Sequence, residues 1–230
     1  MSHGFFDKTR GGLIVSCQAL PEEPLHSSYI MSRMAYAAML GGASGIRANT
    51  VSDIKAIKET VNLPIIGIIK KDYPDSDVYI TPTMDEVDEL VKADVDVIAM
   101  DATSRRRPGG KTIAEIFPAI RRKYPDQLFM ADCATYSDAV QAKELGFDII
   151  GTTLCGYTPE TRDISIPDLN LIEKLCSTLD MPIIAEGGIW SPETLTEVMS
   201  IPGIFAAVVG SAITRPMEIT KRFVRAIRHN

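Results

Sequence analysis

The chain has few cysteines, and their spacing disfavours the structural roles that cysteine plays in pairs. Four cysteines, Cys17, Cys133, Cys155 and Cys176, occur in 230 residues without a C-x-x-C pair. This spacing argues against a zinc site and against a disulfide framework. Three of the four fall near the ends of expected strands, where a buried, reduced thiol is the expected state. Cysteine usage therefore indicates a cytoplasmic protein.

Long apolar runs and a positive net charge are missing as well. The longest apolar runs are strand-sized, so we expect no segment that crosses a membrane. Residues 1–10, MSHGFFDKTR, lack the apolar core of a signal peptide. A net charge of −6 argues against nucleic acid as the main partner. An anionic substrate must then be held by local groups.

Eight apolar runs of strand length recur along the chain, and a helical pattern follows each of them. They cover residues 12–17, 43–46, 64–69, 95–100, 128–131, 147–150, 182–185 and 205–209. Continuously apolar runs indicate parallel strands that are buried on both faces. Their even spacing, with no G-x-G-x-x-G after the first run, favours a closed barrel over an open sheet. We therefore expect a single (β/α)8 TIM barrel domain over residues 1–230, with residues 1–10 as an N-terminal extension and residues 78–80 as a small extra strand over the mouth.

The last two apolar runs both end in glycine turns. Residues 182–185 lead into Glu186, Gly187 and Gly188, and residues 205–209 lead into Gly210 and Ser211. A strand that passes through a glycine turn to a helix start leaves backbone N–H groups free to bind a phosphate dianion. In (β/α)8 barrels, the loops after strands 7 and 8 carry the phosphate site. Arg215, at a helix start beyond the second turn, is a further candidate anion ligand.

Each expected strand is followed by a polar residue. These residues are Gln18, Arg47, Lys70, Asp101, Asp132, Thr153, Glu186 and Ser211. Any one of them alone is readily explained as a loop contact or helix cap. Together they indicate an active site, because the carboxyl ends of barrel strands converge on one mouth and ionisable groups there are costly unless paired. The three histidines lie elsewhere in the sequence, so acid–base chemistry falls to lysine and carboxylates.

Lys70 and Glu186 are the candidate acid–base groups. Lys70 is the first polar residue after PIIGII, and Lys71 is its rival because neighbouring strand residues point to opposite faces. A desolvated lysine near other cations can have its pKa lowered from ~10.4 toward ~7–8 and act as a base or as a Schiff-base nucleophile. A structural ion pair to Asp101 or Asp132 is the alternative. Glu186 fits an acid–base partner for a sugar hydroxyl, with or without a salt bridge to a neighbouring cation.

The basic run Arg105–Arg107 does not directly follow an expected strand. We interpret it as part of a solvated loop.

Several segments resemble one family, the bacterial N-acetylmannosamine-6-phosphate 2-epimerases. They are LIVSCQALPEEPLHSSYIM (13–31), GIRANT (45–50), PIIGIIKKDY (64–73), ADCAT (131–135), GFDIIGTTLCGYT (146–158), IIAEGG (183–188) and VVGSAITRPMEITKRFV (208–224). The resemblance implies a (β/α)8 barrel that interconverts N-acetyl-D-mannosamine 6-phosphate and N-acetyl-D-glucosamine 6-phosphate in sialic acid breakdown. It implies no metal and no other cofactor.

The resemblance also implies roles for individual residues. Lys70 and Glu186 match the catalytic residues of the family. The residues that match its sugar contacts are Gln18, Arg47, Asp132 and Thr153. Those that match its phosphate site are Gly187, Gly188, Gly210, Ser211 and Arg215. The family further implies a homodimer, for which the apolar residues of the last helix (Ile219, Phe223, Val224 and Ile227) offer a docking face.

The chemistry of C2 inversion agrees with this assignment. The C2 hydrogen is acidic only in the open-chain aldehyde, so Glu186 would first move a proton between the ring oxygen and the anomeric hydroxyl. Lys70 would then take the C2 proton, with Arg47 or Gln18 stabilising the enolate oxygen. Whether one lysine or two groups serve both faces stays open. The alternatives are a Schiff-base aldolase or lyase acting through Lys70 and a non-catalytic sugar-phosphate sensor.

Overall fold

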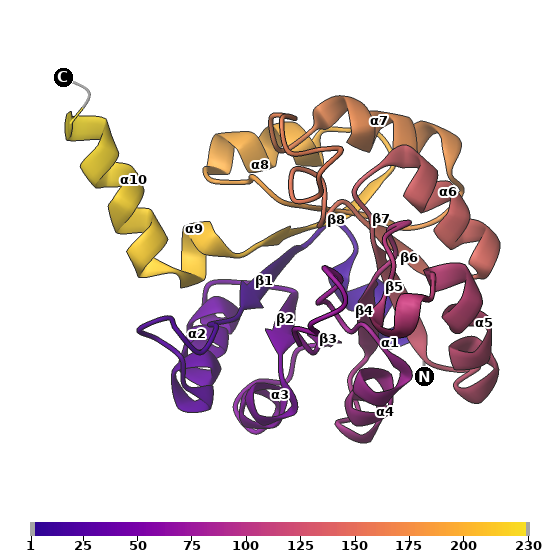
Figure 1. Cartoon of the computed structure of the whole chain (residues 1–230). Helices are drawn as coiled ribbons and strands as arrows, with labels where there is room; N and C mark the ends of the chain where they lie inside the picture. The colour runs from indigo at the N-terminus through magenta and orange to yellow at the C-terminus, as the bar shows by residue number, and fades with distance from the viewer. Residues whose placement is uncertain (1–2, 229–230) are drawn as a thin grey trace.

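The protein is a closed barrel of eight parallel strands inside a layer of helices (Figure 1). The computed structural model describes residues 3–228. Its strands are β1 (Leu13–Cys17), β2 (Gly45–Asn49), β3 (Ile65–Ile68), β4 (Val97–Asp101), β5 (Leu128–Asp132), β6 (Ile149–Gly151), β7 (Ile183–Glu186) and β8 (Ile204–Val209). Each strand pairs in parallel with the next, and β8 pairs with β1 to close the ring. The predicted (β/α)8 fold is confirmed.

The helices follow the strands in alternation. They are α1 (His3–Thr9), α2 (Ser28–Leu40), α3 (Val51–Lys58), α4 (Met84–Lys92), α5 (Ile113–Lys123), α6 (Tyr136–Leu145), α7 (Leu169–Thr178), α8 (Pro192–Met199), α9 (Ser211–Thr214) and α10 (Pro216–Arg228), with a 3-10 turn, η1 (Pro108–Gly110), before α5. Capping chemistry fixes several starts: in α4, Thr83 and Glu86 form a complete capping box. Among the helices of residues 3–228, none is long and apolar enough to span a bilayer.

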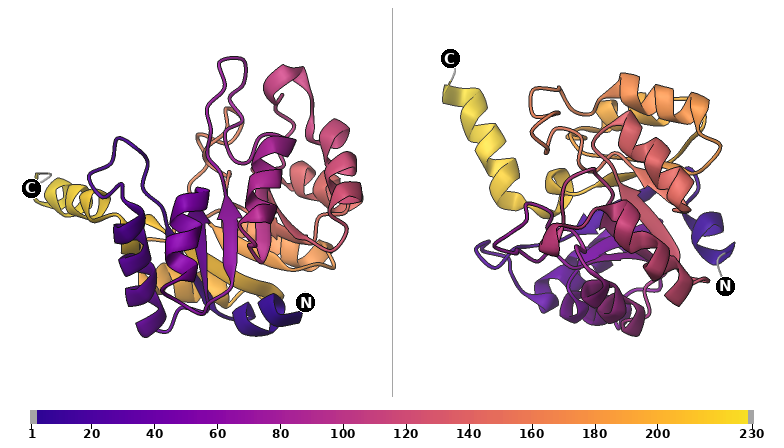
Figure 2. Two further views of the ribbon diagram at one scale, coloured as in Figure 1. Left: turned by 90° about the horizontal axis from the view of Figure 1, so that it is seen from below. Right: turned by 45° about the vertical axis from the view of Figure 1, so that its right-hand side comes forward.

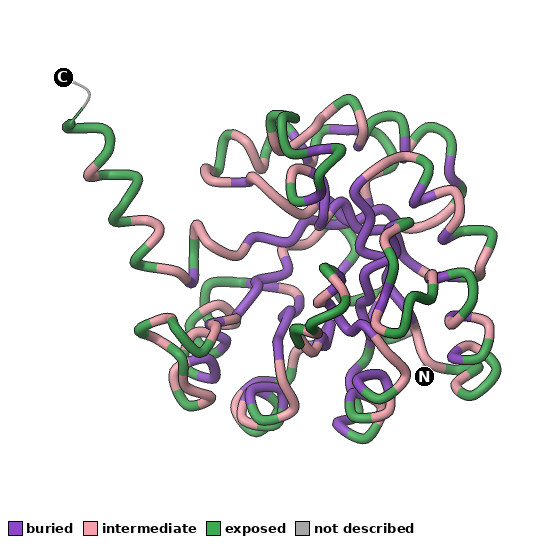
Figure 3. Tube along the Cα trace, in the orientation of Figure 1, coloured by how far each residue is buried: buried purple, intermediate pink, exposed green. Residues whose placement is uncertain are grey.

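Apolar side chains pack on both faces of the sheet, one layer inside the ring of strands and one between the strands and the helices. Ile66 and Ile68 of β3 pack inside the ring, whereas Ile46 and Ala48 of β2 pack outward with helix residues. Figure 3 shows the strands as the buried centre and the outer helix surfaces as exposed. Side chains alternate along a strand, so every second residue points into the barrel. The residue two positions after the last inward-facing residue of a strand therefore points into the mouth. This alternation decides which polar residues reach the site.

Several strands run further than their apolar pattern predicts. The sequence predicts a second strand over residues 43–46, but β2 spans Gly45–Asn49, so Arg47 lies inside the ladder opposite Ser16 and Ile66. In the same way β5 ends on Asp132 and β7 on Glu186. A charged residue can occupy a ladder position here because an opposite charge meets it inside the barrel.

Residues 3–9 form a helix that covers the N-terminal end of the barrel. Residues 1–10 are predicted to be an N-terminal extension, but α1 buries Phe5 to 2% exposure. Phe6 packs edge-to-face on Phe205 of β8 at 5.7 Å between ring centroids. Figure 2 (left) shows α1 at the end of the barrel opposite the tall loops. The two phenylalanines therefore belong to the barrel core.

The segment after β3 stands over the mouth but forms no strand. Residues 78–80 were predicted as a small extra strand, and within the described chain they contribute one isolated bridge, Lys70 to Ile80. A second bridge joins Tyr73 to Ser76 in the same loop. With single bridges in place of a ladder, the segment is a hairpin-like loop, visible as the tall purple loop in Figure 2 (left).

Replacing Phe5 by alanine should destabilise the barrel. Removing a fully buried aromatic ring leaves a cavity, so the free energy of unfolding should fall by about 3 kcal/mol. Denaturant unfolding followed by circular dichroism measures this change. Lys8→Ala, on the exposed side of the same helix, is the control and should stay within about 0.5 kcal/mol of the parent. Equal stability of the Phe5 variant would show that α1 contributes no core packing.

Candidate active site

A cavity of about 620 Å³ opens at the C-terminal end of the barrel. The residues predicted for the site that line it are Gln18, Arg47, Lys70, Thr153, Glu186, Gly187, Gly188, Gly210, Ser211 and Arg215. Asp132 lies beneath this lining, fully buried, and touches two of its members. Of the residues predicted for the site, the barrel thus brings all but Asp101 to this cavity or into contact with its lining.

Arg47 is the centre of a buried charge network. Its Nη1 and Nη2 atoms donate to the two carboxylate oxygens of Asp132 at 3.1 and 2.6 Å. Its Nη1 also lies 3.1 Å from Oε2 of Glu186, and the side chains of Arg47 and Asp132 are 1% and 0% exposed. Burial opposes the charge of Arg47, but Asp132 and Glu186 outweigh it and raise the pKa of Arg47. One guanidinium therefore holds two carboxylates in place.

Glu186 is the second carboxylate of this network. It follows the inward-facing Ile184 by two residues, so its side chain points into the cavity. The hydroxyl of Thr153 donates to Asp132 at 2.7 Å and lies 3.1 Å from Glu186 Oε2. Burial raises the pKa of Glu186, Arg47 opposes that rise, and Asp132 adds to it. A raised pKa brings a carboxyl group closer to the range in which it can both take up and release a proton.

Lys70 faces the same network without an ion pair of its own. It continues the inward series of Ile66 and Ile68 into the cavity. Within residues 3–228 no carboxylate lies within salt-bridge distance of its ammonium group. The alternative prediction, a structural ion pair of Lys70 with Asp101 or Asp132, is therefore wrong. Burial lowers the pKa of Lys70 to about 8, helped by the positive charge of Arg47 and opposed by Glu186.

Lys71 points away from the cavity. Its ammonium group lies 3.1 Å from Glu86 and 5.0 Å from the ring centroid of Tyr73. Hydrogen bonds to Tyr73 and Glu86 raise the pKa of Lys71, the opposite direction to Lys70. The geometry therefore separates the two neighbouring lysines into one facing the cavity and one on the outer surface.

The two glycine turns form adjacent parts of the cavity wall, because β7 and β8 are neighbours. Gly187 and Gly188 have φ values of 106° and 73°, which favour glycine. A Cβ on Gly188 would lie 2.4 Å from the backbone carbon of Ile166, so no larger residue fits. Close approach of the β6–α7 loop thus requires glycine at this turn.

Arg215 lines the cavity beside these turns and is held by a partner that the sequence does not reveal. Its Nε donates to Oε1 of Glu23 at 2.7 Å, and the other carboxylate oxygen of Glu23 accepts from Leu20 N at 2.8 Å. Glu23 lies in the β1–α2 loop, 192 positions from Arg215. Only the closure of the barrel brings the two together.

Asp101 also lies outside the cavity lining and, unlike Asp132, makes its side-chain contacts in a different cluster. Its carboxylate accepts from Thr103 N at 2.9 Å, from the Thr103 hydroxyl at 2.7 Å, and from Arg105. The interpretation of Arg105–Arg107 as a solvated loop is wrong for two of its three residues. Arg107 is 1% exposed and the Arg105 side chain is largely covered, because both guanidinium groups turn inward to acceptors.

The described residues offer no evident metal site. Between residues 3 and 228, no group of three His, Cys, Asp or Glu side chains is arranged to hold a metal ion. The two carboxylates at the cavity already share the charge of Arg47. What the arrangement can do chemically is move protons: it places a lysine of lowered pKa and a carboxyl group of raised pKa around one cavity.

Distant solved structures share the fold alone. Thiamine phosphate pyrophosphorylase from Pyrococcus furiosus is 16% identical, with a TM-score of 0.62, over 93% of this chain and 92% of that one. A (S)-3-O-geranylgeranylglyceryl phosphate synthase from Thermoplasma acidophilum is 18% identical, with a TM-score of 0.57, over 96% and 94%. These likenesses agree with the barrel architecture.

Much nearer relatives match the whole chain. A solved structure of the N-acetylmannosamine-6-phosphate 2-epimerase from Clostridium perfringens is 52% identical, with a TM-score of 0.91, over 96% of this chain and 95% of that one. A Listeria monocytogenes protein named "Putative N-acetylmannosamine-6-phosphate 2-epimerase" is 52% identical over 99% of this chain and 97% of its own length. A protein of the same name from Caldanaerobacter subterraneus is 51% identical over 99% and 96%.

The family profile described as "Putative N-acetylmannosamine-6-phosphate epimerase" matches residues 31–229. That match takes in seven of the eight strands and most of the cavity lining. The chain belongs to the N-acetylmannosamine-6-phosphate epimerase family.

Proposed function

We propose that this protein interconverts N-acetyl-D-mannosamine 6-phosphate and N-acetyl-D-glucosamine 6-phosphate by inverting C2. The observation that carries the proposal is the placement of Lys70, with its lowered pKa, opposite the Arg47–Asp132–Glu186 network in one cavity. C2 inversion needs a base for a carbon acid and a group that can open the sugar ring. Lys70 and Glu186 meet these two needs.

Ring opening comes first, because the C2 hydrogen is acidic only next to the free aldehyde. Glu186 moves a proton between the ring oxygen and the anomeric hydroxyl. Its raised pKa suits this exchange, since the carboxyl group gives up a proton less readily than an ordinary glutamate and can therefore carry one between two sugar oxygens. Thr153 and Arg47 fix the carboxyl group so that one oxygen stays directed at the cavity.

Proton abstraction from C2 then falls to Lys70. A lysine with a pKa of about 8 has about a tenth of its amine unprotonated at pH 7, far more than an ordinary lysine, and that amine is still basic enough to take a weakly acidic proton. The developing enolate gains from the fixed positive charge of Arg47. Gln18 and Arg47 both line the cavity, and we assign them to polar groups of the sugar.

The proton must return to the opposite face of C2. Lys70 follows β3 and Glu186 ends β7, which stand four strands apart in the ring of eight. The two groups therefore approach the substrate from opposite walls. Either Glu186 delivers the second proton or the intermediate turns past Lys70, and deuterium exchange in single variants separates these routes.

The phosphate group anchors the sugar on the rim formed by β7 and β8. We assign it to Gly187, Gly188, Gly210 and Ser211, with the guanidinium of Arg215 beside them. The phosphate is remote from C2, so its binding energy serves to orient the reacting carbon between Lys70 and Glu186.

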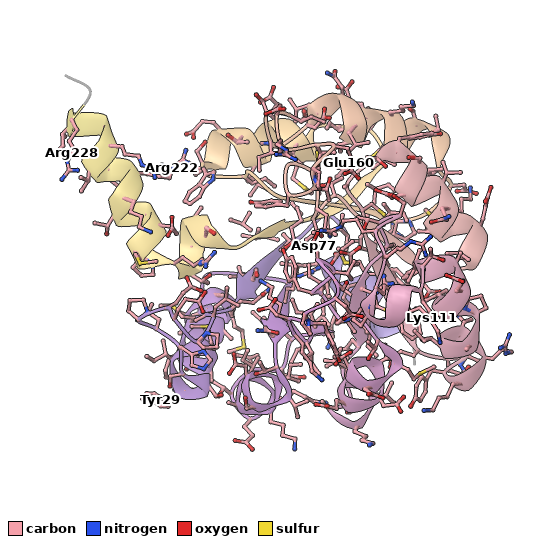
Figure 4. All side chains as sticks on the ribbon, viewed as in Figure 1. Tyr29, Asp77, Lys111, Glu160, Arg222 and Arg228 are labelled. Atoms are coloured by element: carbon pink, nitrogen blue, oxygen red, sulfur yellow. The ribbon has the colours of Figure 1, made fainter. Side chains whose placement is uncertain are left out.

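The last helix supports a homodimer as the working form. Within residues 216–228, α10 buries no side chain, and Phe223 and Ile227 are 73% and 75% exposed. Figure 1 shows α10 projecting away from the barrel, and in Figure 4 Arg222 lies at its inner side, where it stacks on Trp190 at 4.1 Å. An apolar helix face left in water costs free energy, so we assign it to contact with a second copy. Free thiols at all four cysteines fit a cytoplasmic location.

Lys70→Ala should abolish deuterium incorporation at C2 when the protein is incubated with N-acetylmannosamine 6-phosphate in D2O. Loss of the base removes the group that takes the C2 proton from this epimer, whereas Lys71→Ala, outside the cavity, should keep the exchange rate within about twofold. NMR follows both the deuterium and the gluco product. Absence of exchange in the parent protein would overturn the proposed function, and borohydride trapping of a Lys70 adduct would favour the Schiff-base alternative.

The rate should depend on pH through Lys70. Because the unprotonated amine is the active form, kcat/KM should rise about tenfold per pH unit below the pKa and level off above about pH 8. A steady-state pH profile measures this rise in kcat/KM, and NMR titration of the lysine side chains shows whether Lys70 is the group that titrates. A limb that appears only above about pH 10, the range of an ordinary lysine, would contradict this role for Lys70.

Charges on the apolar face of α10 should separate the dimer. Phe223→Glu combined with Ile227→Glu places two carboxylates where the partner packs, so sedimentation velocity should show a monomer. Arg225→Ala, on the other side of the same helix, is the matched control and should stay dimeric. A parent protein that sediments as a monomer at micromolar concentration would contradict the assignment.

A further inference from the structure

Two loops over the mouth are tied together by contacts that the proposed chemistry does not use. They are the β3–α4 loop, residues 69–83, and the β4–α5 loop, residues 102–112, which rise together in Figure 2 (left). The ties are Gly109 N to Asp75 Oδ2 at 2.9 Å, Ser76 Oγ to Arg106 O at 2.8 Å, Arg105 Nη1 to Asp77 O at 3.3 Å, and Arg107 Nη1 to Pro82 O at 3.1 Å. The second loop thus clamps the first along most of its length.

Arg105 is the side chain that links this clamp to the barrel. Its Nε donates to the Thr103 hydroxyl at 3.1 Å, its Nη2 to the buried Asp101, and its Nη1 to the backbone of Asp77. One end of the guanidinium is therefore fixed to the end of β4 and the other holds the β3–α4 loop. In Figure 4, Asp77 lies over the middle of the barrel mouth.

Tyr79 is the residue that the clamped loop presents to the cavity. Its neighbours Val78 and Ile80 are buried, and its backbone oxygen accepts from Lys71 N at 3.0 Å. The Tyr79 side chain lines the cavity and packs on the apolar cluster inside the barrel, which includes Leu154. Burial raises the pKa of the phenol, Asp132 adds to the rise and Arg105 opposes it. The phenol therefore stays protonated and able to donate.

The position of Tyr79 places it at the reacting end of the sugar. It enters from the β3 side, whereas the proposed phosphate rim belongs to β7 and β8 across the ring. A sugar 6-phosphate anchored on that rim puts C1 and C2 at the far end of its carbon chain. Ile80 and Leu154 line the cavity with Tyr79, and the acetyl methyl is the one apolar group that the substrate carries at C2.

We propose that Tyr79 contacts the N-acyl group of the substrate and selects for it, and that Arg105 positions Tyr79 through the backbone of residues 77–79. The phenol donates to the acyl oxygen, and the ring with Leu154 covers the methyl group. This inference rests on the proposed function, because it takes an N-acylated sugar phosphate as the ligand. Tyr79 touches substrate, and Arg105 acts only through the loop.

The test compares binding of N-acetylglucosamine 6-phosphate with binding of glucose 6-phosphate, which lacks the acyl group. Tyr79→Phe should weaken the acylated ligand about three- to tenfold, the loss of one hydrogen bond, and Tyr79→Ala should weaken it further. Both should leave glucose 6-phosphate within about twofold, since the phosphate rim is untouched. Calorimetry measures both ligands, and kcat/KM should fall in parallel. An unchanged ratio in Tyr79→Ala would overturn the proposal.

Tyr73→Phe is the matched control for the phenol. Tyr73 lies in the same loop, but its hydroxyl donates to Glu86 at 2.8 Å, outside the cavity. Its loss should lower stability slightly and leave the ratio of the two ligands unchanged. An equal change in that ratio would mean that the loop as a whole, and not Tyr79, sets the selectivity.

Arg105→Ala tests the positioning role against Arg106→Ala. Arg106 has the same charge in the same loop, yet its side chain donates to Gly110 within its own loop. Arg105→Ala should lower selectivity for the acylated ligand with glucose 6-phosphate binding retained, and Arg105→Lys should recover part of it. Arg106→Ala should change neither. Equal effects of the two alanine variants would overturn the role of Arg105.

Failure of this inference and failure of the proposed function have different signatures. A parent protein that exchanges C2 deuterium but shows unchanged selectivity in Tyr79→Ala refutes the inference alone. A parent protein with no C2 exchange refutes the proposed function, and the ligand ratio from calorimetry then still shows whether Tyr79 recognises an acyl group.

Discussion

A single buried guanidinium holds the mouth of this barrel together. Arg47 lies within the β2 ladder, almost without exposure, and it needs the carboxylates of Asp132 and Glu186 to be stable there. Those carboxylates come from β5 and β7, so the pairing spans the interior of the ring. The buried charge of Arg47 thus also orients the carboxyl groups of the site.

The same network sets the protonation of its neighbours. The positive charge of Arg47 adds to burial in lowering the pKa of Lys70, while burial and the charge of Asp132 raise the pKa of Glu186. A base and an acid with converging pKa values then face one cavity. Burial of apolar side chains stabilises the core elsewhere, whereas burial of Lys70 and Glu186 shifts their pKa values in the directions that proton transfer needs.

The sequence predicts the architecture because continuous apolar runs at even spacing allow few other folds, and it predicts the polar residues at strand ends because few roles suit a charge there. The sequence also favours Lys70 over Lys71, because Lys70 is the first polar residue after the apolar run. The structure adds that Lys70 continues the inward alternation of Ile66 and Ile68. Other features depend on contacts between distant segments. The burial of Arg107, the pairing of Glu23 with Arg215, and the docking of α1 through Phe5 leave no local pattern.

The pairing of Glu23 with Arg215 joins the two ends of the chain at the phosphate rim. The Thr214 hydroxyl also donates to Ser16 O at 2.6 Å, across 198 positions, next to the β1–β8 seam. Contacts of such sequence separation carry a large loop-closure cost in entropy, because most of the chain lies between the two residues. The proposed phosphate rim is therefore complete only when β8 has closed the ring against β1, and a chain that lacks β8 also lacks the second glycine turn of that rim. A ligand that binds this rim therefore stabilises the closed ring relative to any partly open form of the barrel.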